Sequence, residues 1–241
     1  MPSAGLLVIG NEILSGKIVD TNSPFLAGQL RELGVDLERI LVIPDAVDTI
    51  ADETRRFSAS YDHVFTSGGI GPTHDDVTME AIAQAFGRKL ILDEQICARI
   101  ERTQKEPLND AMKKMAFMPE GANVIDVSDL WFPVVVVENV HILPGIPQLF
   151  EKKFQSIRDR FAGVPIHLTR IFVTRHESEI AEDLHALLRE FSELMLGSYP
   201  RIGEPDYRVM LTLESRDPDY LQRAVKSLCE RLPGDVIFRV E

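Results

Sequence analysis

The sequence predicts a three-layer α/β/α domain with a mainly parallel sheet, followed by a smaller α+β subdomain of the ferredoxin-like type. Over the first two thirds of the chain, strand and helix signals alternate, which is typical of right-handed β-α-β crossovers and of a parallel sheet covered on both faces. The last third follows the order β-α-β-β-α-β, the split β-α-β arrangement. The boundary is expected at Gly163-Val164-Pro165, which gives domains at residues 1–163 and 164–241.

Apolar runs and helix-end signals define the elements of the first domain. Residues 5–9 form an apolar run that ends at Gly10, as expected of a buried strand. Ser23-Pro24 pairs a capping residue with proline at the first helical position, and Gly34 ends that helix. The same reasoning predicts further strands at residues 35–43, 63–66, 134–137 and 140–143, and helices at 48–58, 78–86, 93–118 and 147–161.

The second domain is defined by shorter segments. Residues 166–174 alternate between apolar and polar side chains, as a half-buried strand does. Residues 178–191 carry Ile180, Leu184 and Leu187 at helical spacing, which places them on one face. The remaining segments predict strands at 195–199, 207–215 and 235–240 and a helix at 219–232.

Composition excludes several classes of protein. The hydrophobic fraction of the 241 residues is 44%, enough for a core, and the net charge of −12 argues against a nucleic-acid-binding surface. Any anionic ligand must therefore be held by local dipoles, a few placed cations or a metal ion. No run of about 18 apolar residues predicts a membrane span, and the six-residue apolar run at 4–9 has no basic leader of the kind signal peptides carry. Cys97 and Cys229 are far apart in sequence, so a reduced, cytoplasmic protein is expected.

The most informative segment is TSGGIGPTHDDVT at residues 66–78, which leaves a strand and enters a helix. Such loops lie at the carboxyl edge of a parallel sheet, where ligands bind. Gly68, Gly69 and Gly71 allow the backbone to approach a ligand, and their amides can hold a phosphate. The spacing matches neither the dinucleotide fingerprint nor the P-loop.

Asp75 and Asp76 follow these glycines directly. In the simplest alternative they only cap the next helix. Adjacent carboxylates beside an anion site repel the anion unless a cation lies between them. We therefore expect a ligand site in which both aspartates hold a divalent metal.

Two further segments open onto the same predicted edge. Residues 10–22 form a long connection in which Glu12 is a candidate metal ligand or general base, Lys17 a phosphate ligand and Asn22 a ligand contact. The alternatives are a solvated surface lysine for Lys17 and a helix cap for Asn22. The third segment, LPGIP at 143–147, contains Gly145 and matters only if it lies beside the glycine loop. Lys113-Lys114 is expected on a solvated helix face.

Five strings together resemble the molybdopterin-binding-like (MoCF) family, and most closely its CinA branch and the N-terminal domain of FAD synthetase. These strings are GNEILSGKIVDTN (10–22), TSGGIGPTHDDVTMEAIAQAFG (66–87), PEGA (119–122), NVHILPGIPQL (139–149) and LGSYP (196–200). The resemblance implies a three-layer α/β fold with an α+β subdomain after it. It also implies a homo-oligomer. The expected partner is a small nucleotide or pterin ligand, with no nucleic acid and no membrane involved.

The CinA-like resemblance implies a metal-dependent hydrolase of nucleotide pyrophosphates such as ADP-ribose or FAD, with Mg, Mn or Co as the metal. Asp75, Asp76 and Glu12 would be catalytic, and Asp75 and Asp76 would hold the metal. The expected substrate-binding residues are Ser67, Gly68, Gly69, Gly71, Thr73, Asn22, Lys17 and Gly145.

Two alternatives remain open at this point. In the first, the chain is a molybdopterin-binding protein of molybdenum-cofactor biosynthesis. In the second, it is a non-catalytic nucleotide-binding regulator. Two departures from the family pattern bear on this choice: Asn11 stands where many members have Asp, and residues 127–133 replace a GTAPG-like string. The deamidase domain of CinA and the catalytic domain of FAD synthetase lie outside the resemblance, so neither NMN deamidation nor FAD synthesis is expected.

Overall fold

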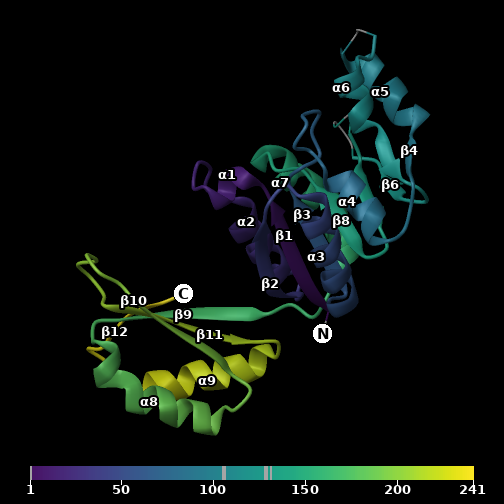
Figure 1. Cartoon of the computed structure of the whole chain (residues 1–241). Helices are drawn as coiled ribbons and strands as arrows, with labels where there is room; N and C mark the ends of the chain where they lie inside the picture. The colour runs from purple at the N-terminus through teal and green to yellow at the C-terminus, as the bar shows by residue number, and fades with distance from the viewer. Residues whose placement is uncertain (1, 105–106, 128–129, 131) are drawn as a thin grey trace. The chain divides into compact units, whose positions relative to one another are not determined.

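The computed structural model describes residues 2–104, 107–127, 130 and 132–241 (Figure 1). The chain divides into two compact units, Met1–Gly163 and Val164–Glu241. Residues 105–106, within the long helix expected from the sequence, lie outside the described part. So do Ser128, Asp129 and Trp131, in the segment where the sequence departs from the family pattern.

A six-stranded sheet forms the centre of the first unit. Its strands are β1 (Ser3–Ile9), β2 (Asp36–Ile43), β3 (His63–Ser67), β6 (Asn123–Ile125), β7 (Val134–Val137) and β8 (Val140–Leu143). They lie in the order β2-β1-β3-β8-β7-β6. The first four are mutually parallel, whereas β7 and β6 run antiparallel to their neighbours. The mainly parallel sheet expected from the sequence is thus confirmed.

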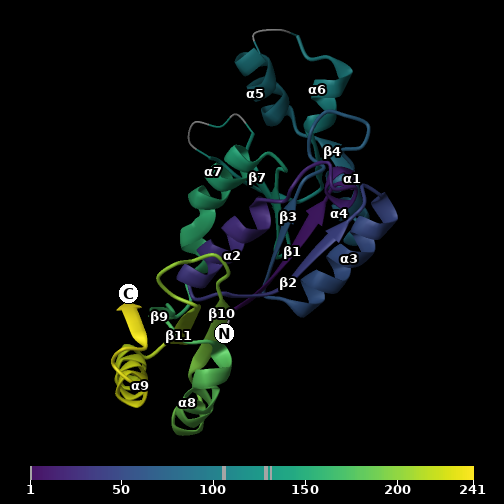
Figure 2. The same ribbon diagram turned by 90° about the vertical axis from the view of Figure 1, so that its left-hand side faces the viewer.

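Helices cover both faces of this sheet (Figures 1 and 2). The helices described in this unit are α1 (Asn11–Leu14), α2 (Asn22–Glu32), α3 (Val47–Ser60), α4 (Thr78–Ala85), α5 (Glu94–Gln104), α6 (Asp110–Met115) and α7 (Pro147–Ile157), of which α5 and α6 lie beyond the sheet. Leu26 of α2 and Phe150 of α7 belong to one buried apolar cluster, together with Phe65 of β3. Ile50 of α3 and Ile82 of α4 belong to a second cluster. The two clusters confirm the three-layer arrangement, because alternate residues of a strand face opposite layers.

The segment between α4 and β6 differs from the sequence expectation. It forms a small excursion, in which β4 (Leu90–Leu92) pairs antiparallel with β5 (Phe117–Pro119) and α5 and α6 lie between them. The single helix expected over residues 93–118 is therefore wrong. A new helix starts because the side chain of Asn109 accepts a hydrogen bond from the amide of Met112, which is a helix cap. Met118 is buried in β5 and not on a helix.

Two helix ends also differ from the sequence expectation. Ser23 is not the cap of α2, which starts at Asn22. At this helix end the carboxylate of Asp20 accepts hydrogen bonds from the backbone amides of Asn22 and Ser23. At the other end of the unit, the helix expected up to residue 161 ends at Ile157, and a 3-10 turn follows (Arg158–Phe161).

The second unit has the expected β-α-β-β-α-β order. Its elements are β9 (His167–Val173), α8 (Glu177–Glu190), β10 (Met195–Pro200), β11 (Val209–Ser215), α9 (Pro218–Arg231) and β12 (Ile237–Val240). The sheet order is β10-β11-β9-β12, antiparallel throughout, which is the ferredoxin-like arrangement. Leu187 of α8 and Leu228 of α9 pack with Leu211 of β11 in a core of their own. None of the helices described in either unit is long and apolar enough to cross a lipid bilayer.

Candidate active site

The carboxyl ends of three neighbouring parallel strands meet at one edge of the first sheet. β1 lies beside β3, and β3 beside β8. The segments that follow Ile9, Ser67 and Leu143 therefore open onto the same edge, where open α/β sheets bind ligands. A Cβ atom built on Gly145 would lie 3.4 Å from the Cα atom of Gly68. The LPGIP segment (143–147) therefore lies directly against the glycine loop, which is the arrangement in which the sequence analysis expected it to matter.

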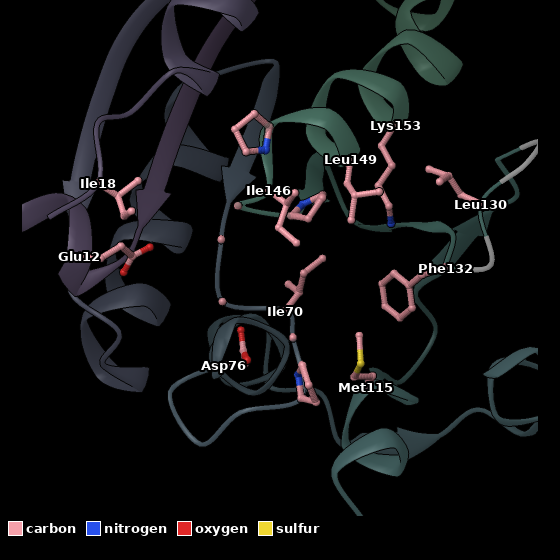
Figure 3. A pocket seen from close by; sticks show the side chains of 17 residues that line it. Glu12, Ile18, Ile70, Asp76, Met115, Leu130, Phe132, Ile146, Leu149 and Lys153 are labelled. Atoms are coloured by element: carbon pink, nitrogen blue, oxygen red, sulfur yellow. The ribbon is translucent and has the colours of Figure 1, made fainter. Parts of the chain in front are cut away.

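A pocket of about 540 Å³ opens over these segments (Figure 3). Glu12 and Asp76 lie at one end of it, and Lys153 and Phe132 lie at the other. The remaining lining residues are Ile18, Gly68, Gly69, Ile70, Gly71, Pro72, Met115, Leu130, Pro144, Gly145, Ile146, Pro147 and Leu149. The pocket therefore combines glycine-rich backbone and two carboxylates with an extended apolar wall.

Two glycines at the base of the pocket have backbone conformations that other residues avoid. Gly68 has φ +112°, and a Cβ atom there would lie 2.1 Å from the carbonyl oxygen of Ile9. Gly69 has φ +68°, and its Cβ atom would lie 2.2 Å from the hydroxyl of Thr78. That hydroxyl donates to the carbonyl oxygen of Gly68 at 2.9 Å. The loop is thus fixed against both β1 and the start of α4, and only glycine fits at these positions.

The backbone amides of this loop are divided between structure and pocket. The amide of Gly68 donates to the carbonyl oxygen of Leu143 at 3.2 Å, so Gly68 lines the pocket without offering its N–H group. Within the part of the chain that the structure describes, the amides of Gly69, Ile70 and Gly71 have no hydrogen-bond partner. All three residues line the pocket. Consecutive amides without a partner are groups that can donate to an anion.

Thr73 brings the two aspartates together. Its hydroxyl lies within hydrogen-bond distance of Asp75 Oδ1 and, at 2.6 Å, of Asp76 Oδ2. Its amide also donates to Asp76 Oδ2 at 2.8 Å. The hydrogen bond from Thr73 is the main reason why the pKa of Asp75 lies below its usual value. Asp76 lines the pocket, whereas Asp75 is exposed beside it.

The aspartates do not cap the helix that follows them. Val77 occupies the N-cap position of α4, and no side chain accepts a hydrogen bond at that helix end. The capping alternative considered for Asp75 and Asp76 is therefore wrong. Their carboxylates instead close the turn around Thr73, and Lys114 of α6 reaches the same turn by donating to the carbonyl oxygen of Thr73. This contact was not foreseen, because the Lys113-Lys114 pair was expected on a solvated face.

Asn22 connects all three segments from a buried position. Its side-chain amide donates to Ser67 Oγ at 2.8 Å and to the carbonyl oxygen of Gly145 at 2.9 Å. Asn22 and Ser67 border a small hollow of about 60 Å³, which Glu12 also lines. The side chain does not cap α2. The capping alternative is thus wrong for Asn22 as well, and its N–H groups serve to hold the loops together.

The two remaining candidates of the first segment are placed differently. Glu12, on α1, lines the main pocket, and its carboxylate folds back over Gly10: a Cβ atom there would lie 2.5 Å from Glu12 Oε1. Lys17 is exposed and does not line the main pocket. The structure therefore brings Glu12 towards Asp76 and leaves Lys17 outside.

The donor atoms fit a divalent metal of the hard, oxygen-preferring kind. Asp75 and Asp76 offer carboxylate oxygens around one hydroxyl, and Mg²⁺ is commonly bound by one or two carboxylates together with substrate phosphates and water. Among the described residues, no group of three or more His, Cys, Asp or Glu side chains could hold a metal by itself. A metal held here would take its remaining ligands from the substrate and from water.

Sequence reasoning missed two residues at the far end of the pocket, Lys153 of α7 and Met115, which belong to no recognisable motif. Phe132, which also lines this end, lies in the segment 127–133, where the sequence departs from the family pattern. Met115 lies at the end of α6, in the segment between β4 and β5. Lys153 lies on α7, whose sequence is that of an ordinary amphipathic helix. The only sequence signal was a lysine at a position of α7 that helical spacing assigns to the buried face, next to Phe154.

Comparison with known proteins agrees with the fold and with the division into two units. Residues 5–162 match the family model of a probable molybdopterin binding domain, and residues 165–241 match that of the FAD synthase middle domain. A CinA protein from Thermoplasma acidophilum, known from its crystal structure, is 32% identical, with a TM-score of 0.62 over 66% of this chain and 97% of that one.

Full-length similarity extends to archaeal and animal proteins. A protein of Archaeoglobus fulgidus is 37% identical over 94% of this chain and 96% of its own length. A probable FAD synthase of Caenorhabditis elegans is 33% identical over 98% of this chain but only 51% of its own length. The chain thus spans about half of that enzyme. Together with the loops described above, these matches show that the chain belongs to the molybdopterin-binding-domain (MoCF) family, in its CinA-like and FAD-synthase-like branch.

Proposed function

We propose that this protein hydrolyses the pyrophosphate of nucleotides such as ADP-ribose or FAD with the help of a divalent metal. The observation that carries the proposal is the set of three unpartnered amides at Gly69–Gly71, next to the carboxylates of Asp75 and Asp76. Phosphate-binding amides next to carboxylates are typical of metal-assisted phosphate chemistry. Mg²⁺, Mn²⁺ or Co²⁺ would neutralise the charge between phosphate and carboxylates.

Each group then has a defined role. The amides of Gly69, Ile70 and Gly71 bind one phosphate and stabilise the negative charge that develops on it. Asp76 and Asp75 hold the metal. Glu12, at the same end of the pocket, accepts a proton from the attacking water. The water oxygen forms a new bond to phosphorus, the bridging P–O bond breaks, and the departing nucleoside monophosphate keeps the bridging oxygen.

The test is release of AMP from ADP-ribose or FAD in the presence of Mg²⁺, Mn²⁺ or Co²⁺. Asp76→Ala is expected to lower kcat at least a hundredfold, because it removes a metal ligand. Asp52→Ala is the matched control, since Asp52 is an exposed aspartate on α3 that pairs with Arg55, and it should keep the wild-type rate. No AMP under any of the three metals, or full activity of Asp76→Ala, would overturn the proposal.

A second candidate function is supported by the family match of residues 5–162 to a probable molybdopterin binding domain. The same amides would then hold the pterin phosphate, and the protein would act in molybdenum-cofactor biosynthesis. Calorimetry separates the two functions. Tight binding of molybdopterin without hydrolysis of any nucleotide would favour the second, whereas ADP-ribose turnover with weak pterin binding would favour the first. Nucleotide binding without turnover would instead indicate a regulatory module.

A further inference from the structure

The pocket has two chemically different halves, and the proposed hydrolysis uses only one of them. Glu12 and Asp76 lie in the half next to the glycine loop, whereas Lys153 and Phe132 lie in the other (Figure 3). The wall of this second half is apolar apart from Lys153 and includes Ile70, Met115, Leu130, Phe132 and Leu149. A ligand that fills the whole pocket must therefore present an apolar body to this half.

Lys153 is a buried amine that has no carboxylate partner among the described residues. Only 2% of the surface of Lys153 is exposed to solvent. Its ammonium group donates to the carbonyl oxygen of Pro133 and lies 4.4 Å from the centre of the Phe132 ring. Within the described part of the chain, it has no carboxylate partner. Since an ammonium has three protons to donate, the protein leaves part of its hydrogen-bonding capacity unused.

Burial has a marked effect on this amine. Desolvation by burial lowers the pKa of Lys153 to about 7. Glu12 and Asp76, the other titratable residues that line the pocket, lie in the opposite half. A hydrogen-bond acceptor placed in the apolar half would restore the charged form.

A purely structural role accounts poorly for this arrangement. Holding the carbonyl group of Pro133 in place needs one donor, which a neutral side chain can supply. A buried amine with unused donors instead costs stability. Such costs are typical of groups that a ligand completes.

We propose that Lys153 recognises the edge of a planar ring that carries carbonyl oxygens, bound in the apolar half of the pocket. The proposal rests on the proposed function in one respect, because it places the pyrophosphate of the same ligand at Gly69–Gly71. The ring system of a flavin presents two carbonyl oxygens on one edge and an apolar body on the other. Adenine presents an amino group and ring nitrogens. The lysine therefore favours the flavin end of a dinucleotide in this half.

Riboflavin tests this assignment without any contribution from phosphate or metal. Its binding is measured by flavin fluorescence in the presence of EDTA. Pyrophosphate is the ligand for the other half, and its binding is measured separately in the presence of Mg²⁺. Lys153→Met should weaken riboflavin binding about tenfold or more, as expected for loss of a charged hydrogen bond. The same substitution should leave pyrophosphate binding within twofold. Lys152→Met, a change at the exposed neighbouring lysine, should alter neither.

A measurement on the unmodified protein covers the case in which Lys153→Met does not fold. At pH 8 an amine with a pKa near 7 is mostly unprotonated. Riboflavin binding should therefore take up a proton, which calorimetry detects by comparing buffers of different ionisation enthalpy. Absence of riboflavin binding, binding without proton uptake, or equal losses for riboflavin and pyrophosphate in Lys153→Met would each overturn the proposal.

The outcome also separates this inference from the proposed hydrolysis. Lysine-dependent riboflavin binding without AMP release would uphold the ring site and contradict the hydrolase. Hydrolysis of ADP-ribose by a protein that does not bind riboflavin would do the reverse.

Discussion

Asn22 donates its side-chain amide to the carbonyl oxygen of Gly145 at 2.9 Å, across 123 positions of sequence. The same side-chain nitrogen donates to Ser67 Oγ. One buried amide thus connects the segments that follow three different strands. This contact links the loops that carry the pocket-lining Gly68 and Gly145.

Replacing Asn22 should loosen the edge of the sheet. Asn22→Ala removes the buried hydrogen bond to Ser67 Oγ and the part-buried one to the carbonyl oxygen of Gly145, and a buried partner left unsatisfied typically costs about 1–3 kcal/mol. Urea denaturation measures the loss. Asn123→Ala is the control, because Asn123 is exposed on β6 and its replacement should cost little. Equal stability of the two variants would show that the Asn22 contact is not what holds the loops.

Gly69 and Gly87 offer a matched pair of substitutions. Both have positive φ, +68° and +63°, so alanine is strained at either position. At Gly69 the added Cβ atom also meets the hydroxyl of Thr78 at 2.2 Å, whereas at Gly87 it meets nothing within 4 Å. Gly69→Ala should therefore lower the free energy of unfolding more than Gly87→Ala, by at least about 1 kcal/mol. It should also weaken pyrophosphate binding, which Gly87→Ala should not.

Thr73 sets the protonation of its neighbour. Thr73→Val keeps the shape of the side chain and removes the hydroxyl, so the pKa of Asp75 should rise towards its ordinary value. Carboxyl-carbon NMR titration measures this shift. Divalent-metal binding should then begin to fail at a higher pH than in the wild type, because a protonated carboxylate is a poor ligand. Thr103→Val, on α5, should leave the titration of Asp75 unchanged.

His141 makes the first unit sensitive to acid. Both of its ring nitrogens are buried without a hydrogen-bond partner in the described structure. Burial is the main cause that lowers its pKa to about 3. The unfolded chain, with a histidine pKa near 6.5, therefore binds more protons between pH 3 and 6.5. The contribution of His141 to the free energy of unfolding is fully present above pH 6.5. It falls as the pH drops, by at most about 1.4 kcal/mol per pH unit.

His141→Phe removes this proton binding and keeps an aromatic ring among Phe65 and Phe161. The variant should lose less stability than the wild type between pH 6.5 and 4, as followed by urea unfolding at each pH. His185→Phe, at an exposed position of α8, should retain the wild-type pH dependence. An unchanged acid response of His141→Phe would place the sensitivity elsewhere.

The sequence predicts the layers, the parallel core of the sheet and the topology of the second unit, because these follow from apolar periodicity and turn residues. It also indicates which loops meet, since parallel strands share an edge. It does not predict the break between α5 and α6, where the Asn109 cap competes with helical periodicity. Nor does it predict Lys153, whose role depends on a pocket wall assembled from Met115, Phe132 and Leu149.

The hairpin of β4 and β5 has a consequence for evolution within the family. Leu90 pairs with Pro119, so the two ends of the insertion lie side by side, while Met115, just before β5, lines the pocket. A closed insertion of this kind can be lengthened, shortened or exchanged without disturbing the register of the main sheet. Changes within this insertion can therefore alter the pocket wall at Met115, with the glycine loop at the edge of the sheet left intact.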